Sequence, residues 1–472
     1  MSPTLSARRV AHPSMDERAA AGKEARAEVG RRVHGAWEPA TDRSDPVELL
    51  EEQGRTRVPE LVPIRYGRML VSPFTFFRGG AYLMASDLAG EPRTGLDVQL
   101  CGDAHLSNFG VFAAPDRRMV FSVNDFDETL PGPFEWDVKR LVASFEVAGR
   151  DRGFDGGQRR EINLAAARAY REAMRSFAEM GTMDVWYMRL AVDDLARRWS
   201  GEATREQRKR FEKNLAKARA KDSMRALGKL TQVVDGERRI VGDPPLIIPV
   251  EDAAGGRDPQ EIEEYLHGVI RSYRRTLSGD RRRLLERFRY VHAARKVVGV
   301  GSVGTRAWIV LLLGRDNDDP LMLQAKEAEA SVLEPFLGTS TFANHGQRVV
   351  EGQRLVQAAS DIMLGWIRVD GIDGVKRDFY LRQLWDAKGS ALVEEMNPGA
   401  MNAYAATCGW TLARGHARSG DPVAIASYLG GGHAFDRAMA AFADSYADQN
   451  ERDYEALSAA AASGRVRVET GL

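Results

Sequence analysis

The segment from Leu100 to Asp127 most constrains the fold of this 472-residue chain. It reads LCGDAHLSNFGVFAAPDRRMVFSVNDFD, and its apolar run at 119–123 predicts a buried strand. A turn at Pro115 precedes this strand, and the polar cluster Asn124–Asp127 follows it. A first polar cluster, Gly102–Asn108, stands before the turn. Two polar clusters are therefore carried on one short piece of chain.

The spacing of these polar residues is the one that phosphoryl transfer to a hydroxyl requires. Asp103 would orient the hydroxyl and accept its proton, while Asn108 and Asp125 would hold Mg²⁺ against the phosphates. Asp127 would support a second metal ion, and His105 would shape the loop because Asp103 already supplies the base. Asp, Asn and Gly also form turns, so either cluster alone is better explained as an ordinary loop. The two clusters together, with a strand between them, favour the catalytic interpretation.

Two motifs of this chain resemble the catalytic and metal-binding loops of the aminoglycoside phosphotransferase branch of protein-kinase-like enzymes. They are Gly102-Asp103-X-His105-X-X-Asn108 and, after it, Asp125-Phe126-Asp127. Cys101 stands where that branch usually has a histidine. The resemblance implies a two-lobed fold with ATP and Mg²⁺ as cofactors. It also implies that Asp137, at the start of the next expected helix, hydrogen-bonds the catalytic loop from behind, although an ordinary helix cap explains its position equally well.

Composition excludes several other classes of protein. The chain has 67 Lys and Arg against 67 Asp and Glu, which argues against a dedicated nucleic-acid binder. Two cysteines form no disulfide framework, the N-terminus lacks the apolar core of a secretory signal, and no apolar run approaches a membrane span. We therefore expect a cytoplasmic protein. The kinase-like resemblance implies a small-molecule acceptor as its partner. No pattern indicates an oligomeric state.

The pattern of elements predicts an α+β fold in four parts. Residues 1–45 are expected to be disordered or extended before a short helix, and 46–290 to form a catalytic-loop lobe that is largely helical after 135. Residues 291–390 are expected to form a small β-rich lobe that grips nucleotide, and 391–472 a helical part that completes the large lobe. The charged run at 197–221 is best interpreted as a solvated helix face rather than a lid or an acceptor-binding surface.

The small lobe begins as strand, glycine-rich turn, strand, tight turn and strand. Gly299, Gly301, Ser302 and Gly304 would let backbone amides approach phosphates, which Lys326 on the third strand could reach. A dinucleotide-binding interpretation of these glycines requires a helix after them. The strand-like run at 307–313 favours a kinase-style hairpin instead.

A kinase-like small lobe also needs a glutamate that pairs with the lysine and a hinge that meets adenine. Glu351 is preferred because its helix directly precedes the next strands, and Glu334 is the second candidate. A surface salt bridge is the ordinary alternative for either glutamate. The hinge would include Gln383, Leu384 and Trp385.

The order of these parts is the reverse of that in ordinary kinase-like chains. Either the glycine-rich segment is unrelated, or the chain is circularly permuted, which is possible when termini lie close together. Permutation is favoured because the glycine loop, the lysine, the helix and the following strands keep their internal order. The whole pattern also resembles a bacterial family known as domain of unknown function 2252. Its signatures here, over about residues 45–460, are FFRGGAYLMASDLA, CGDAHLSNFG, VNDFDETLPGPFEWDVKRL, QRVVEGQRLVQAASDIMLGW and FYLRQLWDAKGS.

The leading hypothesis is thus an ATP- and Mg²⁺-dependent phosphotransferase acting on a small-molecule hydroxyl. The same scaffold could instead transfer AMP, or bind nucleotide as a regulator without catalysis. A third class is a metal-dependent hydrolase that uses Asp103, His105, Asp125 and Asp127 as ligands, although one histidine among carboxylates is unusual for zinc. Arg78 could contact phosphate, but a structural arginine at a helix start is favoured. His416 is expected on a helix face near a C-terminus rather than in the site.

Overall fold

The strand predicted over 119–123 is present as β3 (Met119–Val123), and all five of its residues are buried. The structure is a computed structural model that describes residues 11–199, 205–220, 222–297, 299–371, 373–384 and 386–471. β3 pairs antiparallel with β2 (Phe109–Ala113). The outer neighbours of this pair are β14 (Gly389–Ser390) and β5 (Leu190–Ala191). A separate antiparallel pair joins β1 (Asp97–Leu100) to β4 (Leu130–Pro133).

A six-stranded antiparallel sheet contains the strands that flank the glycine-rich turn. In spatial order its strands are β12 (Gly365–Asp370), β13 (Lys376–Gln383), β11 (Pro320–Ala328), β10 (Ala307–Leu313), β9 (Arg289–Lys296) and β8 (Ile247–Pro249). Side chains alternate along β11, so Leu323 and Ala325 join an apolar cluster with Tyr273 on one face. Lys326 consequently points from the opposite face. A separate hairpin consists of β6 (Thr231–Val234) and β7 (Glu237–Ile240).

The helical part is built around α6 (Phe134–Asp151), in which every residue from Phe134 to Gly149 is buried. The Phe134 ring lies 5.9 Å from the ring of Tyr170 and 5.8 Å from that of Tyr428. Burying one such side chain stabilises a fold by about 1.5–3 kcal/mol. The helices that pack with α6 or with one another here are α7 (Gly156–Glu179), α17 (Pro398–Ser419), α18 (Pro422–Leu429) and α19 (Ala434–Ala462).

The N-terminal segment 1–45 was predicted to begin disordered or extended and then to form a short helix. The described part of this segment forms a helix that begins at Met15. Residues 1–10 lie outside the described part of the chain, and α1 (Met15–Glu28) follows. A capping box starts this helix, because the Ser14 side chain accepts from the Glu17 backbone N–H while the Glu17 side chain accepts from the Ser14 backbone. α1 packs against α18, so tertiary contact holds a helix of polar composition in place.

The remaining elements complete the two parts. Near the N-terminus they are η1 (Val33–Gly35), α2 (Pro46–Gly54), η2 (Pro59–Leu61), α3 (Val62–Met69), α4 (Pro73–Gly79) and α5 (Ala81–Ala89). The others are η3 (Leu106–Asn108), α8 (Thr182–Tyr187), α9 (Val192–Trp199), α10 (Arg205–Arg219), α11 (Ser223–Leu230), α12 (Val250–Ala253), α13 (Pro259–Arg274), α14 (Gly279–Leu285), α15 (Glu334–Leu337), α16 (His345–Val356) and η4 (Val393–Glu395). The fold is α+β, as predicted.

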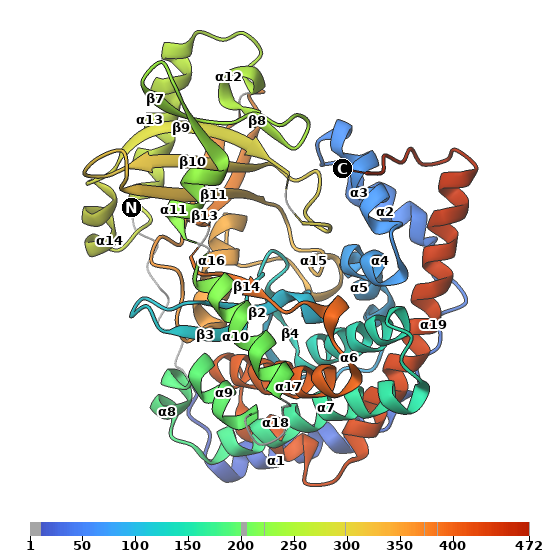
Figure 1. Ribbon diagram of the computed structural model, residues 1–472. Coiled ribbons are helices and arrows are strands. Elements are labelled where there is room, and N and C mark those ends of the chain that lie inside the picture. Colours follow the sequence, from blue (N-terminus) through green and yellow to red (C-terminus); the bar gives the residue numbers. More distant parts are fainter. Residues whose placement is uncertain are drawn as a thin grey trace.

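Figure 1 shows the six-stranded sheet at one end of the molecule and the long helices at the other. α19 runs along one side and contacts α2 and α4, so a helix near the C-terminus meets helices from the first hundred residues. Each helix in the described ranges is too short or too polar to span a lipid bilayer. Residues 200–204 and 221 of the charged run lie outside the described part, while α10 within that run contacts β2 and β14.

Candidate active-site cleft

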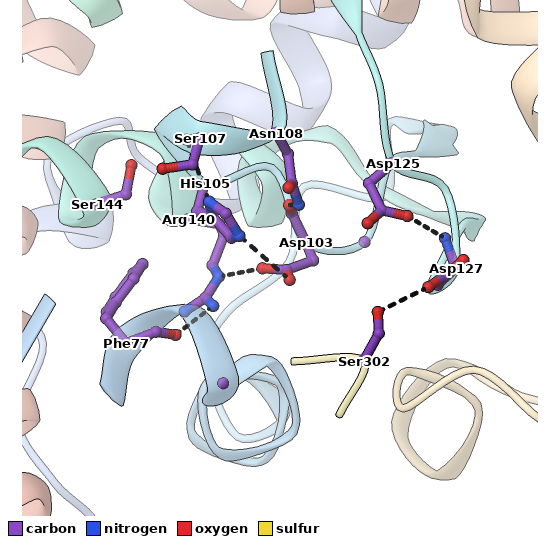
Figure 2. A network of polar contacts seen from close by, with 12 residues as sticks. Phe77, Asp103, His105, Ser107, Asn108, Asp125, Asp127, Arg140, Ser144 and Ser302 are labelled. Carbon is purple, nitrogen blue, oxygen red and sulfur yellow. Dashed lines mark hydrogen bonds and ion pairs between the residues drawn. The ribbon is translucent and has the colours of Figure 1, made fainter. Parts of the chain in front are cut away.

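A cleft of about 690 Å³ lies where the glycine-rich turn faces the two polar clusters. One wall carries Asp103, Asn108, Asp125 and Asp127, and the opposite wall carries residues 299–302. Figure 2 shows the same arrangement, with Ser302 pointing toward Asp127. Regions far apart in sequence therefore meet at one concave site, as the sequence pattern required.

The loop that carries Asp103 is held from behind by Asp137. The Asp137 carboxylate accepts from the backbone N–H groups of Cys101 at 2.7 Å and Gly102 at 3.1 Å. His416 lies in the last turn of α17, as expected, but it is fully buried, with Nε2 3.2 Å from Asp137 Oδ2. Its Nδ1 lies 2.8 Å from the Tyr170 hydroxyl. Tyr170 and His416 thus hold Asp137 in place, and Asp137 in turn holds the loop that carries Asp103. His416 itself lies outside the cleft.

Gly102 is required by the shape of this loop. Its φ of +84° lies in the left-handed region, where side chains other than glycine are strained. A Cβ at this position would also collide with the carbonyl oxygen of Glu128. The two polar clusters are therefore packed backbone to backbone at this point.

Asp103 forms an ion pair with a residue that the sequence interpretation missed. Arg140 Nε donates to Asp103 Oδ1 at 2.8 Å, and Arg140 Nη2 donates to the carbonyl of Phe77 at 2.7 Å (Figure 2). Burial raises the pKa of Asp103, and the lowering effect of the Arg140 and Arg78 guanidinium groups does not cancel it. A carboxylate with a raised pKa that remains held in place is suited to accept a proton.

His105 and Asn108 shape the same loop. His105 Nδ1 accepts from the Ser107 backbone N–H at 3.2 Å, and its Nε2 lies 3.7 Å from Asp103 Oδ2. Burial and the nearby arginines lower the pKa of His105, so the ring is neutral. Asn108 Nδ2 donates to the Asp103 carbonyl at 2.8 Å, which leaves its amide oxygen as a possible ligand.

Asn108 and Asp125 come together because β2 and β3 are paired. The Asn124 backbone N–H donates to the Asn108 carbonyl at 2.8 Å, and Asp125 is the next residue. Burial and the neighbouring Asp127 raise the pKa of Asp125. An amide oxygen beside a carboxylate fits Mg²⁺, which takes few protein ligands and completes its shell with phosphate oxygens and water. Within the described ranges no three His, Cys, Asp or Glu side chains group as a metal cage.

Asp127 connects the two walls of the cleft. Lys326 Nζ donates to Asp127 Oδ2 and lies 4.0 Å from Asp125 Oδ1, and the Tyr380 hydroxyl donates to Asp127 Oδ1 at 2.6 Å. Burial acts to raise the pKa of Asp127, but Lys326 and Tyr380 outweigh it and the pKa is lowered. Burial likewise acts to lower the pKa of Lys326, but Asp125 and Asp127 raise it. Each oxygen of Asp127 thus has a donor partner, Lys326 or Tyr380, and the expected role of Asp127 beside a second metal ion stays a prediction.

The glutamate expected to pair with Lys326 is not its partner here. Glu351 pairs with Arg354 at 3.2 Å, and Glu334 Oε1 lies 3.8 Å from His345 Nδ1. The ion pairs that Lys326 makes with described residues are those to Asp125 and Asp127. Asp125 and Asp127 therefore supply the negative charge that balances Lys326 in this structure, where the sequence pattern had predicted a helix glutamate.

The glycine-rich turn is a hairpin connection, as predicted. β9 and β10 pair antiparallel on either side of it, and no helix follows the glycines. Gly299 and Gly304 have φ values of +68° and +92°. Arg57 Nη1 donates to the Gly301 carbonyl at 2.8 Å, so the segment after α2 holds the turn over the cleft. This contact links residues 244 positions apart and had no signal in the sequence pattern.

The expected hinge is closed to a nucleotide base in this conformation. The Leu384 backbone N–H donates to the Met322 carbonyl at 2.9 Å, and the Gln383 backbone N–H donates to Asp361 at 2.7 Å. Leu384 and Met322 are buried in an apolar cluster with Leu227 of α11. Trp385, the third expected hinge residue, lies outside the described residues. The open part of the cleft thus lies near Asp127, while α11 covers the apolar surface beside Leu384.

These features define an α+β protein with a polar cleft between a six-stranded antiparallel sheet and a helical part. The chain belongs to the family described as uncharacterized proteins conserved in bacteria, domain of unknown function 2252, whose model matches residues 57–460. No curated protein and no solved structure matches the chain.

Proposed function

We propose that this protein is an ATP- and Mg²⁺-dependent phosphotransferase that acts on a hydroxyl of a small molecule. The observation that carries the proposal is the meeting of Lys326 with Asp125 and Asp127 across the cleft, with Asp103 on the same wall. A lysine on the strand that follows a glycine-rich hairpin, facing a metal-binding carboxylate and a catalytic one, is the arrangement of protein-kinase-like phosphoryl transfer.

The polar groups of the two clusters and of the sheet have separate roles in the proposed reaction. Asp103, with its raised pKa, accepts the proton of the acceptor hydroxyl while Arg140 keeps its carboxylate in position. Asn108 and Asp125 supply the oxygen ligands for Mg²⁺, which when bound neutralises charge on the phosphates. The backbone of residues 299–304 covers the phosphates, and Lys326 reorients from Asp127 toward them.

A circularly permuted protein-kinase-like fold accounts for the order of these parts. The glycine-rich turn, Lys326 on the third strand, helix α16 and strands β12 and β13 follow one another as in the small lobe of such enzymes. The Glu469 backbone N–H donates to the Pro63 carbonyl at 3.0 Å, so residues near 469 pack beside α3, ahead of the loop that carries Asp103 (Figure 1).

Product mass tests the proposal directly. The purified protein is incubated with Mg-ATP and pools of hydroxyl-bearing small molecules, and products are examined for an added phosphate or an added AMP. A phosphate gained with wild-type protein and lost with Asp103→Asn supports the phosphotransferase. An added AMP points to nucleotidyl transfer on the same scaffold. Nucleotide binding that is unchanged in Asp103→Ala, with no product from any pool, favours a non-catalytic regulator.

A further inference from the structure

Arg78 is a cation of the cleft wall that has no bonded partner. It lies in the last turn of α4 rather than at a helix start, and it lines the cleft with Asp103 and Gly301. Its Nε is buried without a hydrogen-bond partner, and its guanidinium forms no ion pair or hydrogen bond with any residue that the structure describes. Its electrostatic neighbours are Asp103 and Glu394, neither of which bonds to it.

The neighbouring arginines differ from Arg78 in this respect. Arg140 binds Asp103 and the Phe77 carbonyl, and its guanidinium stacks 3.8 Å from the Phe77 ring centre. Arg57 binds carbonyl groups of the glycine-rich turn. These two side chains are used to build the site. Arg78 is partly buried and retains its set of N–H donors, so an anion in the cleft would supply the partner that no described residue supplies.

The location of Arg78 specifies which anion that is. A Cβ on Gly301 would stand 3.2 Å from the Arg78 carbonyl oxygen, so the glycine-rich turn passes directly over the Arg78 backbone. Asp103, which faces the acceptor hydroxyl, is its strongest electrostatic neighbour. Arg78 therefore stands between the group that covers the phosphates and the group that takes the proton, where the transferred phosphoryl group has to pass.

We propose that Arg78 binds the phosphoryl group during its transfer; this rests on the proposed function. The acceptor oxygen forms a bond to the γ-phosphorus while the bond from that phosphorus to the ADP oxygen breaks, and ADP keeps the electron pair. The proton of the acceptor hydroxyl passes to Asp103. Arg78 remains charged and donates to the phosphoryl oxygens, for which a planar guanidinium suits better than an ammonium group.

Two measurements test Arg78 with different probes. Inorganic phosphate is titrated into the wild-type protein, Arg78→Gln, Arg78→Lys and the control Arg55→Gln, which removes an exposed arginine outside the cleft. We expect the phosphate Kd to rise at least tenfold in Arg78→Gln, by a smaller factor in Arg78→Lys, and to stay unchanged in Arg55→Gln. An unchanged Kd in a folded Arg78→Gln protein overturns the proposal, and Arg78→Lys gives the same decision if the glutamine variant does not fold.

The second measurement separates this site from the proposed function. Turnover of Mg-ATP, with water as the acceptor if none is known, should fall by about 10³ in Arg78→Gln, while the Kd of Mg-ATP changes by less than about fivefold. Equal losses in Kd and turnover, or neither loss, contradict a role in the transfer step. If wild-type protein binds phosphate through Arg78 but neither binds nor turns over Mg-ATP, the phosphotransferase is wrong, and Arg78 is an anion-binding residue of another reaction.

Discussion

Lys326 and Asp127, 199 positions apart in the chain, form a buried ion pair across the cleft. The Lys326 side chain is 4 % exposed and that of Asp127 is 27 % exposed, so solvent screens their attraction only weakly. The pair therefore joins the sheet to the loop that carries Asp125 and Asp127.

Removing one partner of this pair should destabilise the protein strongly. Lys326→Met leaves Asp127 charged and partly buried with only hydroxyl donors, and we expect a loss of about 3 kcal/mol in the free energy of unfolding, measured by urea denaturation. The double variant Lys326→Met/Asp127→Asn should recover part of that loss. As a control, Arg283→Met removes an arginine whose side chain is 85 % exposed and should cost under about 0.5 kcal/mol. Additive losses in the double variant would contradict the pairing.

Two glycines with similar φ angles provide a matched test of how the loop that carries Asp103 packs. Gly95→Ala, at φ +70° with open space around the new Cβ, should cost about 1 kcal/mol from backbone strain alone. Gly102→Ala, at φ +84° and directed at the Glu128 carbonyl, should cost several times more in thermal unfolding. If Gly102→Ala unfolds at the same temperature as Gly95→Ala, the Gly102 backbone does not pack against the Glu128 carbonyl as described.

Local sequence patterns were sufficient to predict strands whose residues are set apart by turns close by in the sequence. β3 and the run of β9, β10 and β11 could be predicted because each is an apolar segment between turn residues. Arg140 was missed although a signal existed. It lies three residues after Asp137 on α6, so the two side chains share a helix face, and placing Asp137 beneath the loop also places Arg140 there.

The remaining differences arise from contacts between distant segments. Periodicity put Glu351 on a helix but could not show that Asp127 already balances the charge of Lys326. Likewise, the chain after Gln383 has the composition of a hinge, yet the apolar surface beside it is covered by α11, which comes from a segment about 150 positions earlier. The hydrogen bond from Arg57 to the glycine-rich turn is another contact between distant segments.

Acid should weaken the fold through His34, which is buried beside the Tyr428 hydroxyl at 2.7 Å. Burial and Lys139 lower the pKa of His34 from 6.5 to about 3, so between these values the unfolded chain binds a proton that the folded chain does not. Stability from this group is complete above pH 6.5 and is lost as pH falls toward 3, by about 2 kcal/mol between pH 7 and pH 5. His34→Gln should flatten this slope in urea denaturation at several pH values, whereas His267→Gln, at an exposed position, should not. Equal slopes in His34→Gln and wild type would contradict a neutral buried ring.

Helix α11 should limit access of the nucleotide base to the cleft. Leu227 of α11 packs with Met322 and Leu384 on the face of the sheet that also carries Lys326, where a base would continue from the phosphates. Leu227→Glu would bury a charge in this apolar cluster, so the helix should leave the sheet and the affinity for Mg-ATP, measured by calorimetry, should rise by about tenfold or more. Met224→Glu, on the same helix but 48 % exposed, should leave that affinity unchanged. Hydrogen exchange should show α11 losing protection in Leu227→Glu alone. If α11 exchanges faster in that variant without any gain in affinity, the base binds elsewhere and the face beside Leu384 is structural.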